Sequence, residues 1–502
     1  MEKIVASGVA TLELVIKVAP QKNDGSLLYK LYNRIDRRLF RADALEPVSV
    51  EDLFHEKNTN KETELDVVVN FASSDLNPQF ADRAKYGVWF YDFGDAPGVN
   101  ELIHKIPVSV AALKAFKGDQ EHVVYQSVSP TLSRFSVRLN NNTIFWKSAA
   151  FVARALEDLY HQRELDQSGV SHASAFNPNP TPGNAAMTSM FLKLSGRAAA
   201  RAFEKLSSFE QWILAYKINR GDWQYLIPPP DRFWADPFPI EANDKHYIFF
   251  EDYVNAAGRA HIAVVEVDQN GIVSGPTEVL KLDCHLSYPF VFEHEGDYFM
   301  IPEMGGRNVV ELYRAVSFPF EWRPEKVLLE AKSPLDATVI NVEGTWWMFV
   351  NIEEPGVAVN WDELHLYYAA SLFGPWRPHA RNPIVSDVRS ARPAGRLFWS
   401  NNELYRPSQD SSLRYGYATT INKVTELSAV AYNETEVLKI LPDWDKDIIG
   451  VHTLNWDGDL LVLDCLWKRK RLQSSRPRPP KDSLDLVTSA NMEARGKTGL
   501  DL

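Results

Sequence analysis

A pattern of short strands and tight turns returns five times between residues 234 and 463. Each copy has a polar anchor, an apolar strand, a turn at Gly, Asn or Asp, and a second apolar strand. The anchors lie at positions 236, 288, 336, 392 and 452, so they are 52, 48, 56 and 60 residues apart. A period near 50 residues built from strands and turns is typical of a β-propeller. The sequence therefore predicts an all-β, five-bladed β-propeller.

The anchor residues stand at the start of the first strand in each copy. In a propeller these positions converge on the central channel, so residues far apart in the sequence should meet there. The residues concerned are Asp236, Ser287 with the adjacent Tyr288, Asp336, Arg392 and His452. We expect the functional site at this convergence.

Composition limits the possible partners and locations. The 502 residues suggest two or more domains, and the net charge of -12 argues against a nucleic-acid partner. The two cysteines cannot form a disulfide framework and favour a reducing compartment. No run of eighteen apolar residues and no secretory signal is present, so we expect a cytoplasmic protein without a membrane span. The oligomeric state stays open.

Residues 1–160 have the pattern of an α/β domain. The apolar run Leu65–Phe71 is typical of a strand inside a parallel sheet. Further strands are expected at Tyr86–Phe93, Val108–Ala115 and His122–Ser127, with helices at Leu27–Phe40 and Lys147–Tyr160.

The stretch Gly87-Val88-Trp89-Phe90-Tyr91-Asp92, with Asp119 further on, resembles the N-terminal domain of formyltransferases that use formyl-tetrahydrofolate. The resemblance covers residues 65–127 and implies a Rossmann-type sheet, whose first strand we expect to be missing. The family's Asn falls on Phe90 and its His on Asp92, and only the Asp is kept, at Asp119. Phe90 cannot move a proton and Asp92 would repel an oxyanion, so a structural module is favoured over an active formyltransferase. A retained activity would use formyl-tetrahydrofolate beside Asp119.

The segments around the repeats form a linker, a helix and a tail. Residues 161–210 hold a Pro- and Asn-rich linker followed by a helix over Ala185–Phe209. The charges of this helix exclude a membrane span. It packs between domains or lies on a membrane surface, and packing is the favoured alternative. We expect Gln211–Ile218 to complete the last blade of a propeller over residues 211–470, and residues 471–502 to be a disordered tail.

The run Trp234-Ala235-Asp236-Pro237-Phe238 resembles the five-bladed clan of arabinanases, xylosidases, invertases and levansucrases. It is more similar to the N-terminal domain of plant glucosamine inositolphosphorylceramide transferases, in the same superfamily. Two further stretches carry this likeness, and it covers about residues 211–467. They are Ser371-Leu372-Phe373-Gly374-Pro375-Trp376, and Arg392-Pro393-Ala394-Gly395-Arg396 with Tyr405-Arg406-Pro407-Ser408-Gln409-Asp410.

In the hydrolytic families of this clan, three channel carboxylates act as base or nucleophile, pKa-tuning Asp and general acid. The resemblance implies that Asp236 has the first role and that Asp336 stands at the place of the acid. The tuning Asp is replaced by Ser287-Tyr288, which puts ordinary hydrolysis in doubt. Glu303 is a second candidate for the acid, and Glu251 is another substitute carboxylate.

Five further residues are candidate substrate ligands: Trp234, Tyr288, Arg392, Arg406 and His452. Structural roles compete with each assignment. An Asp before Pro often caps a turn, and a buried His is often a satisfied core residue. The two arginines could be ion-pair partners of Asp410 or Glu303, and the aromatic residues could be core.

Three functions follow from these alternatives. The first is an enzyme that cleaves or transfers a glycosidic bond of a carbohydrate or glycolipid, with Asp236 as base or nucleophile and Asp336 or Glu303 as acid. The second is a non-catalytic glycan-binding module in glycan or glycolipid assembly. The third is N-formylation of an amino sugar by the N-terminal domain. No resident cofactor is expected for the first two, and no Cys/His metal-binding pattern is present.

Overall fold

The computed structural model describes residues 8–11, 26–40, 65–71, 84–94, 97–117, 120–163, 182–219, 221–353, 359, 361–470, 477, 478 and 480. The chain divides into two compact units. One comprises Met1–Ala200 with Pro355–Ala358, and the other comprises Arg201–Glu354 and Val359–Leu502. The predicted linker falls largely outside the described residues, as do Asp119 and most of the predicted tail.

The first unit contains a four-stranded sheet in the order β1-β2-β3-β4. Its strands are β1 (Val68–Asn70), β2 (Val88–Asp92), β3 (Val108–Lys117) and β4 (Gln120–Pro130). Only β1 and β2 are parallel; β2, β3 and β4 are antiparallel. The prediction of a Rossmann-type parallel sheet is therefore wrong for these strands. Two residues separate β3 from β4, and a connection so short can only join antiparallel neighbours.

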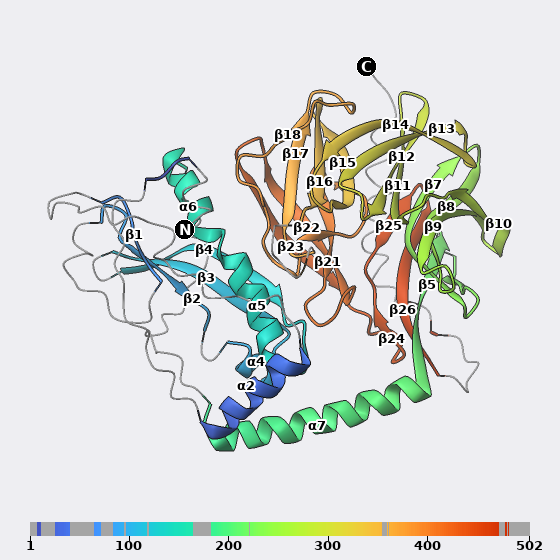
Figure 1. Cartoon of the computed structure of the whole chain (residues 1–502). Helices are drawn as coiled ribbons and strands as arrows, with labels where there is room; N and C mark the ends of the chain where they lie inside the picture. The colour runs from blue at the N-terminus through green and yellow to red at the C-terminus, as the bar shows by residue number, and fades with distance from the viewer. Residues whose placement is uncertain are drawn as a thin grey trace. The chain divides into compact units, whose positions relative to one another are not determined.

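Four helices of this unit are described (Figure 1). They are α2 (Leu27–Leu39), α4 (Val99–His104), α5 (Val137–Ser148) and α6 (Phe151–Tyr160). Ser26 and Ser136 cap α2 and α5 by accepting a hydrogen bond from a backbone N–H of the first turn. The helix predicted over residues 147–160 begins only at Phe151, because the chain turns at Ala149 and Ala150.

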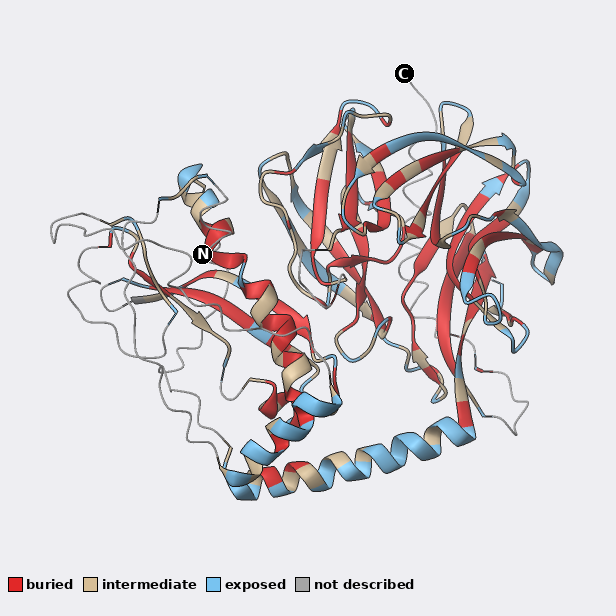
Figure 2. Ribbon diagram, in the orientation of Figure 1, coloured by how far each residue is buried: buried red, intermediate tan, exposed pale blue. Residues whose placement is uncertain are grey.

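A long helix leads into the second unit. The helix α7 (Asn184–Ser207) is followed without a loop by β5 (Ser208–Ile218). Figure 2 shows that most of α7 is exposed, and only Met187 and Met190 on it are fully buried. Among the described helices, none is both long enough and apolar enough to cross a membrane.

The described residues of the second unit form five antiparallel sheets. The first contains β7 (Arg232–Ala242), β8 (Lys245–Val254), β9 (Arg259–Asp268) and β10 (Gly271–Leu280). The second contains β11 (His285–His294), β12 (Asp297–Gly305), β13 (Val309–Ser317) and β14 (Glu321–Glu330). The third contains β15 (Leu335–Val342), β16 (Thr345–Asn351), β17 (Leu364–Ala369) and β18 (Arg377–Pro378).

The last two sheets have five strands each. The fourth contains β19 (Arg392–Pro393), β20 (Phe398–Ser400), β21 (Glu403–Asp410), β22 (Ala418–Leu427) and β23 (Tyr432–Ile440). The fifth contains β24 (Ile448–Gly450), β25 (Leu454–Asp457), β26 (Leu460–Lys470), β5 and β6 (Gln224–Leu226).

The fifth sheet joins the beginning and the end of this unit. The strand β5 pairs with β26 in unbroken register from Ser208 opposite Lys470 to Ile218 opposite Leu460. Neighbouring sheets contact one another from the first to the fourth, and hydrogen bonds from Leu454 N to Ala394 O and from Arg396 N to Asn455 Oδ1 join the fourth to the fifth. The fifth contacts the first through β26 and β7, so the sheets close into the ring of a propeller. Closure of this kind pairs the edge of β26 that would otherwise be open.

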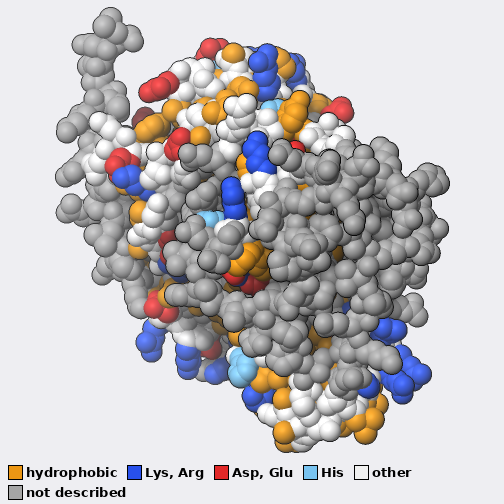
Figure 3. All heavy atoms as spheres, turned by 90° about the vertical axis from the view of Figure 1, so that its left-hand side faces the viewer, with side chains coloured by type: hydrophobic (Ala, Val, Ile, Leu, Met, Phe, Trp, Pro, Cys, Tyr) orange, Lys and Arg blue, Asp and Glu red, His pale blue; other side chains and the backbone are white. Residues whose placement is uncertain are grey.

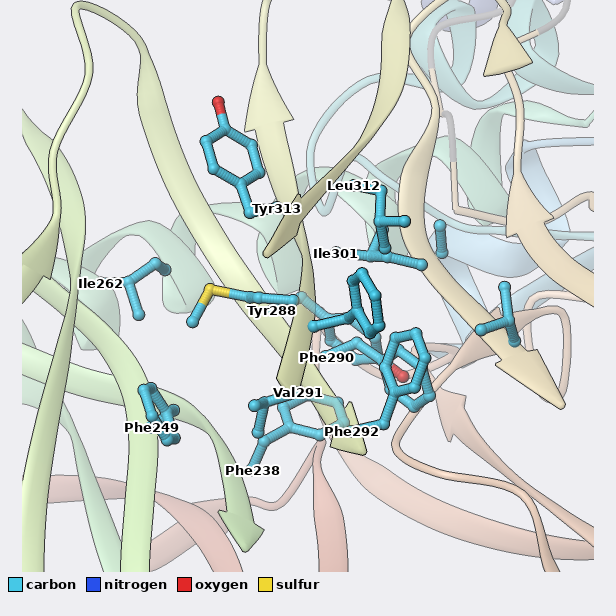
Figure 4. Packing of buried hydrophobic residues seen from close by; sticks show 14 of the residues in the cluster. Phe238, Phe249, Ile262, Tyr288, Phe290, Val291, Phe292, Ile301, Leu312 and Tyr313 are labelled. Carbon is cyan, nitrogen blue, oxygen red and sulfur yellow. The ribbon is translucent and has the colours of Figure 1, made fainter. Parts of the chain in front are cut away.

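Apolar side chains fill the spaces between neighbouring sheets. Figure 4 shows the cluster between the first and second sheets, where the ring of Phe238 meets the edges of Tyr288 and Phe290 at centroid distances of 4.8 and 5.7 Å. Alternate residues of β7, namely Phe238, Ile240 and Ala242, point into this cluster, because side chains of a strand alternate between its two faces. The polar anchors between them are thus held on a rigid apolar support.

Candidate functional site

The same backbone feature recurs at the anchors of the first three sheets. Asp236, Tyr288 and Asp336 all have positive φ angles, of 51°, 43° and 53°. Each lies in a register shift between the first and second strands of its sheet. A β-bulge turns a side chain out of the regular alternation, and such bulges are common beside functional sites. The repeat found in the sequence is therefore also a repeat of a local backbone conformation.

The carboxylate of Asp236 is buried and has partners on β11 and in the segment between β24 and β25. Its Oδ1 accepts a hydrogen bond from Thr453 Oγ1 at 2.8 Å and lies 3.4 Å from His452 Nε2. Its Oδ2 accepts the backbone N–H of Tyr288 at 3.2 Å. The first, second and fifth sheets thus meet at this carboxylate.

Asp464, on β26, supports this arrangement from behind. Its two oxygens accept the backbone N–H groups of Asp236, His452 and Thr453, each at 3.0 Å. Its Oδ2 lies 2.6 Å from His452 Nδ1, and the ring of Trp212 stacks on the imidazole with centroids 4.1 Å apart. The imidazole therefore lies between two carboxylates in a fixed orientation. The sequence prediction missed Asp464, although an acidic residue in the apolar run Leu460–Trp467 was a signal for it.

Asp336 and Glu303 share a cation. Arg392 donates from Nε to Asp336 Oδ2 at 2.5 Å and from Nη2 to Glu303 Oε2 at 3.3 Å. Gln409 Nε2 also donates to Asp336 Oδ2 at 3.4 Å, whereas Asp336 Oδ1 is buried without a hydrogen-bond partner. The second, third and fourth sheets meet at this ion pair, and all three charged residues are largely buried.

Glu251, at the inner end of β8, is a further buried carboxyl group. Its Oε1 lies 3.3 Å from His285 Nε2. Burial raises the pKa of Glu251 well above its usual value, and the charge of Asp236 raises it further. Burial also lowers the pKa of His285, so burial disfavours the charged form of both partners in this contact. We call a set of six residues the polar ring: Asp236, Glu251, Glu303, Asp336, Arg392 and His452.

Burial and neighbouring charges shift the pKa values of several groups in the polar ring. Burial raises the pKa of Asp236 to about 6, against the opposing charge of His452. Burial and the charge of Asp336 raise the pKa of Glu303 well above its usual value. Burial lowers the pKa of His452, but the carboxylates of Asp464 and Asp236 outweigh it and the net shift is upward. Carboxyl groups with pKa values held apart in this way can divide the roles of base and acid.

Tyr288 takes the place at which the resemblance implies a tuning Asp. Its hydroxyl lies 3.0 Å from Thr338 Oγ1 and accepts the backbone N–H of Gly395 at 2.9 Å. The side chain is completely buried and links the second, third and fourth sheets. The burial and the hydrogen bonds of Tyr288 therefore indicate a structural role for this side chain beside the polar ring.

Two predicted substrate ligands lie elsewhere. Trp234 is buried in the apolar cluster between the first and fifth sheets, with its ring 5.0 Å from that of Phe250. Arg406 is completely buried, and its guanidinium donates to both oxygens of Glu434 at 2.8 and 2.6 Å within the fourth sheet. These contacts favour structural roles for both side chains, and their assignment as substrate ligands stays a prediction.

A metal ion was not predicted, yet three ligand groups lie close together. Ligand atoms of Asp236, His452 and Asp464 lie within 4.8 Å of one another, and all three residues are buried. Both oxygens of Asp464 already accept backbone N–H groups, so hydrogen bonds explain why the three side chains lie close together. The expected lack of a metal stays a prediction.

The residues that resemble a formyltransferase motif lie on β2. Asp92 pairs with Lys114 Nζ at 2.7 Å across the β2–β3 pair. Burial raises the pKa of Asp92, but the hydrogen bonds from Lys114 and from the backbone N–H of Gly94, together with the charge of Lys114, outweigh this effect and the net shift is downward. An anionic carboxylate beside Phe90 offers no proton for acyl transfer. Formyl transfer and the role of Asp119 stay predictions.

Residues 223–458 match a protein family described as the N-terminal region of glucosamine inositolphosphorylceramide transferase 1. Relatives of that name from Oryza sativa subsp. japonica and Arabidopsis thaliana are each 37% identical over 212 residues. The similarity covers 41% of this chain and 28% of each relative. The chain is thus similar to less than a third of the length of these transferases.

Three solved structures with similarity to the chain are glycoside hydrolases. A thermostable family-43 glycoside hydrolase is 13% identical, with 55% of this chain and 89% of that chain covered and a TM-score of 0.32. Zg3597, a family 117 glycoside hydrolase from Zobellia galactanivorans, is 12% identical, with 56% of this chain and 98% of that chain covered and a TM-score of 0.34. An exo-1,5-alpha-L-arabinanase from a bovine ruminal metagenomic library is 12% identical, with 50% of this chain and 97% of that chain covered and a TM-score of 0.33.

Proposed function

We propose that the second unit acts on a carbohydrate or on the sugar headgroup of a glycolipid, cleaving or transferring a glycosidic bond at the polar ring. The observation that carries the proposal is the buried Asp236 carboxylate, which is fixed by Thr453 and His452 and accompanied by acids with raised pKa values. Glycosidic bond cleavage needs such a division between a carboxylate and a protonated acid. The matched transferase family supports a sugar as the substrate class.

Asp236 is assigned the role of base or nucleophile. Its φ of 51° and three side-chain contacts fix the direction of the carboxylate before a substrate arrives. A group that is already oriented needs no reorganisation in the transition state. The adjacent His452 lies 3.4 Å from Asp236 Oδ1 and has a raised pKa, because the carboxylates of Asp464 and Asp236 outweigh the effect of burial.

Glu303 suits the role of acid better than Asp336. Asp336 accepts the shorter of the two hydrogen bonds from Arg392, at 2.5 Å against 3.3 Å for Glu303. The guanidinium is therefore bound mainly by Asp336, while Glu303 has a raised pKa. Burial also raises the pKa of Glu251, which is the second candidate for the acid.

The first experiment tests Asp236. Turnover of a panel of glycans, glycolipids and aryl glycosides is measured for the full chain and for Asp236→Asn, which keeps the shape and tolerates the positive φ. We expect turnover to fall at least about a hundredfold, the usual loss for a removed general base. Asp410→Asn is the matched control, because Asp410 is a buried carboxylate paired with Lys439 outside the polar ring. Equal turnover of Asp236→Asn and the unmodified chain would refute the proposal.

The acid is identified by its leaving-group dependence. Glu303→Gln, Glu251→Gln and Asp336→Asn are compared on substrates with poor and with activated leaving groups. A variant lacking the acid should lose turnover on the former and keep it on the latter, because an activated leaving group needs no proton. Retention of both activities in Glu303→Gln would reassign the acid to whichever of the other two residues shows the expected dependence.

A glycan-binding module without turnover is the second candidate. The observation that favours it is Arg392, whose ion pairs occupy two of the three acid candidates at once. This function predicts that sugars stabilise the chain against heat while no panel member is converted. Thermal-shift measurements on the unmodified chain and on Asp236→Asn separate the two functions.

A further inference from the structure

The helix α2 has one face that is locked to the first unit. Tyr32 donates a hydrogen bond from its hydroxyl to Phe135 O at 2.8 Å, and its ring lies against Phe191 of α7. The carboxylate of Asp36 accepts hydrogen bonds from Ser136 Oγ at 2.5 Å and from Arg138 N at 3.0 Å. Buried polar contacts of this kind fix the rotation of the helix about its axis. The orientation of its other face is therefore determined as well.

That other face is apolar and exposed. Leu27, Leu31, Ile35 and Leu39 are 76%, 47%, 39% and 70% exposed. They follow one another at intervals of four residues, which places them in one stripe along the helix. Single exposed leucines are common on protein surfaces, but a stripe of four on one helix is not explained by packing within the unit.

Basic residues lie beside this stripe. Lys30, Arg34, Arg37 and Arg38 are all exposed, and none forms an ion pair with a carboxylate among the described residues. The only acidic residue of α2 is the buried Asp36, so the helix carries a net charge of +3 in a chain of net charge -12. The neighbouring start of α7 adds the exposed residues Leu192 and Lys193. Figure 3 shows apolar side chains flanked by Lys and Arg at the lower end of this face, where α2 and α7 begin.

We infer that α2 is a docking surface for a membrane that contains anionic lipids. A stripe of leucines bordered by unpaired Lys and Arg is suited to lying in the lipid headgroup region, with the leucines among the acyl chains and the cations beside phosphates and carboxylates. The charge of α2 is opposite to that of the rest of the chain, so it selects an anionic surface specifically. This inference does not depend on the proposed function of the polar ring.

The test is flotation of the full chain with vesicles of phosphatidylcholine alone or with about a third phosphatidylserine. We expect binding to the anionic vesicles that decreases with added salt. Arg34→Gln/Arg37→Gln/Arg38→Gln should weaken binding about a hundredfold, at about fivefold for each charge removed. The double variant Leu27→Ser/Leu31→Ser should abolish it.

Two controls separate docking from general stickiness or misfolding. Leu413→Ser/Val430→Ser removes two exposed apolar side chains from the second unit and should bind as the unmodified chain does. All variants are checked by circular dichroism and by their thermal unfolding. Absence of binding to anionic vesicles, or undiminished binding of Leu27→Ser/Leu31→Ser, would overturn the inference; in that case an acidic protein partner becomes the alternative occupant.

A local probe reports insertion directly. A nitrobenzoxadiazole dye is attached to Leu31→Cys in a Cys284→Ser background, with Leu413→Cys in the same background as control. Its emission should shift to shorter wavelength at position 31 when anionic vesicles are added, and stay unchanged at position 413. No shift at position 31 would also overturn the inference, because the leucine stripe would then remain in water.

Discussion

The position of the Asp236 carboxylate depends on the residues that surround it. Asp464 holds the backbone of Asp236 and the imidazole of His452, and the imidazole in turn faces the Asp236 carboxylate. A buried carboxylate without such support would cost several kcal/mol of folding free energy. The sequence repeat predicted Asp236 and His452, but Asp464 lies on a second strand outside the anchor pattern.

The raised pKa of Asp236 predicts a pH dependence of stability. The folded pKa is about 6 against an ordinary value of 3.8, so between about pH 4 and pH 6 the unfolded state binds fewer protons. Stability therefore falls as pH rises through this window, by about 3 kcal/mol for this group. Urea unfolding of the unmodified chain and of Asp236→Asn should show this loss only in the former. A difference between the two that does not change from pH 4 to pH 6 would contradict the pKa shift.

At the scale of elements, the first strands do more than line the polar ring. The bulges at Asp236, Tyr288 and Asp336 lie in strands that the sequence predicted, but no local sequence pattern predicted the bulges themselves. Gly395 follows β19 and lies close to β11 and β25, because its N–H donates to the Tyr288 hydroxyl and a Cβ added to it would lie against Leu454 O. A close approach of this kind explains a glycine better than a turn does.

Gly395→Ala is expected to destabilise the second unit strongly. An added Cβ would lie 2.2 Å from Leu454 O and 2.8 Å from Asn455 Oδ1, so the fourth and fifth sheets must move apart. Gly271→Ala is the matched control, because Gly271 has a similar φ of 136° against 143° and no atom within 4 Å of the added Cβ. Urea unfolding should show on the order of 3 kcal/mol greater loss for Gly395→Ala. Equal losses would mean that backbone strain alone matters at both sites.

At the scale of the whole molecule, ring closure joins residues from opposite ends of the second unit. The strand β5 supplies its full length to the fifth sheet, and β26 then contacts β7 of the first sheet. The prediction that Gln211–Ile218 completes the last sheet agrees with this pairing. Without β5, β26 would be an open edge beside the polar ring.

Ala215→Pro should open this closure. Ala215 pairs with Leu463 of β26 on one side and with Tyr225 of β6 on the other. A proline at this position therefore removes a backbone N–H from a strand that has a neighbour on each side. We expect a loss of about 3 kcal/mol or more and a less cooperative thermal transition of the second unit. Ala215→Gly keeps the N–H and should cost only about 1 kcal/mol. Calorimetry that finds the two variants equally stable would show that β5 is not needed for closure.

The sequence by itself determined the repeated strands, their tight turns and the anchor positions, because side-chain alternation and turn preferences act over a few residues. Only the tertiary structure decided which anchors meet. Asp464 reaches Asp236 across 228 positions and Arg392 reaches Glu303 across 89, while Arg406 and Trp234 are used within the fold. It also decided that the first unit's sheet is mainly antiparallel and that α2 exposes its leucines. Such pairings depend on which strands and helices become neighbours, and local preferences carry no information about that.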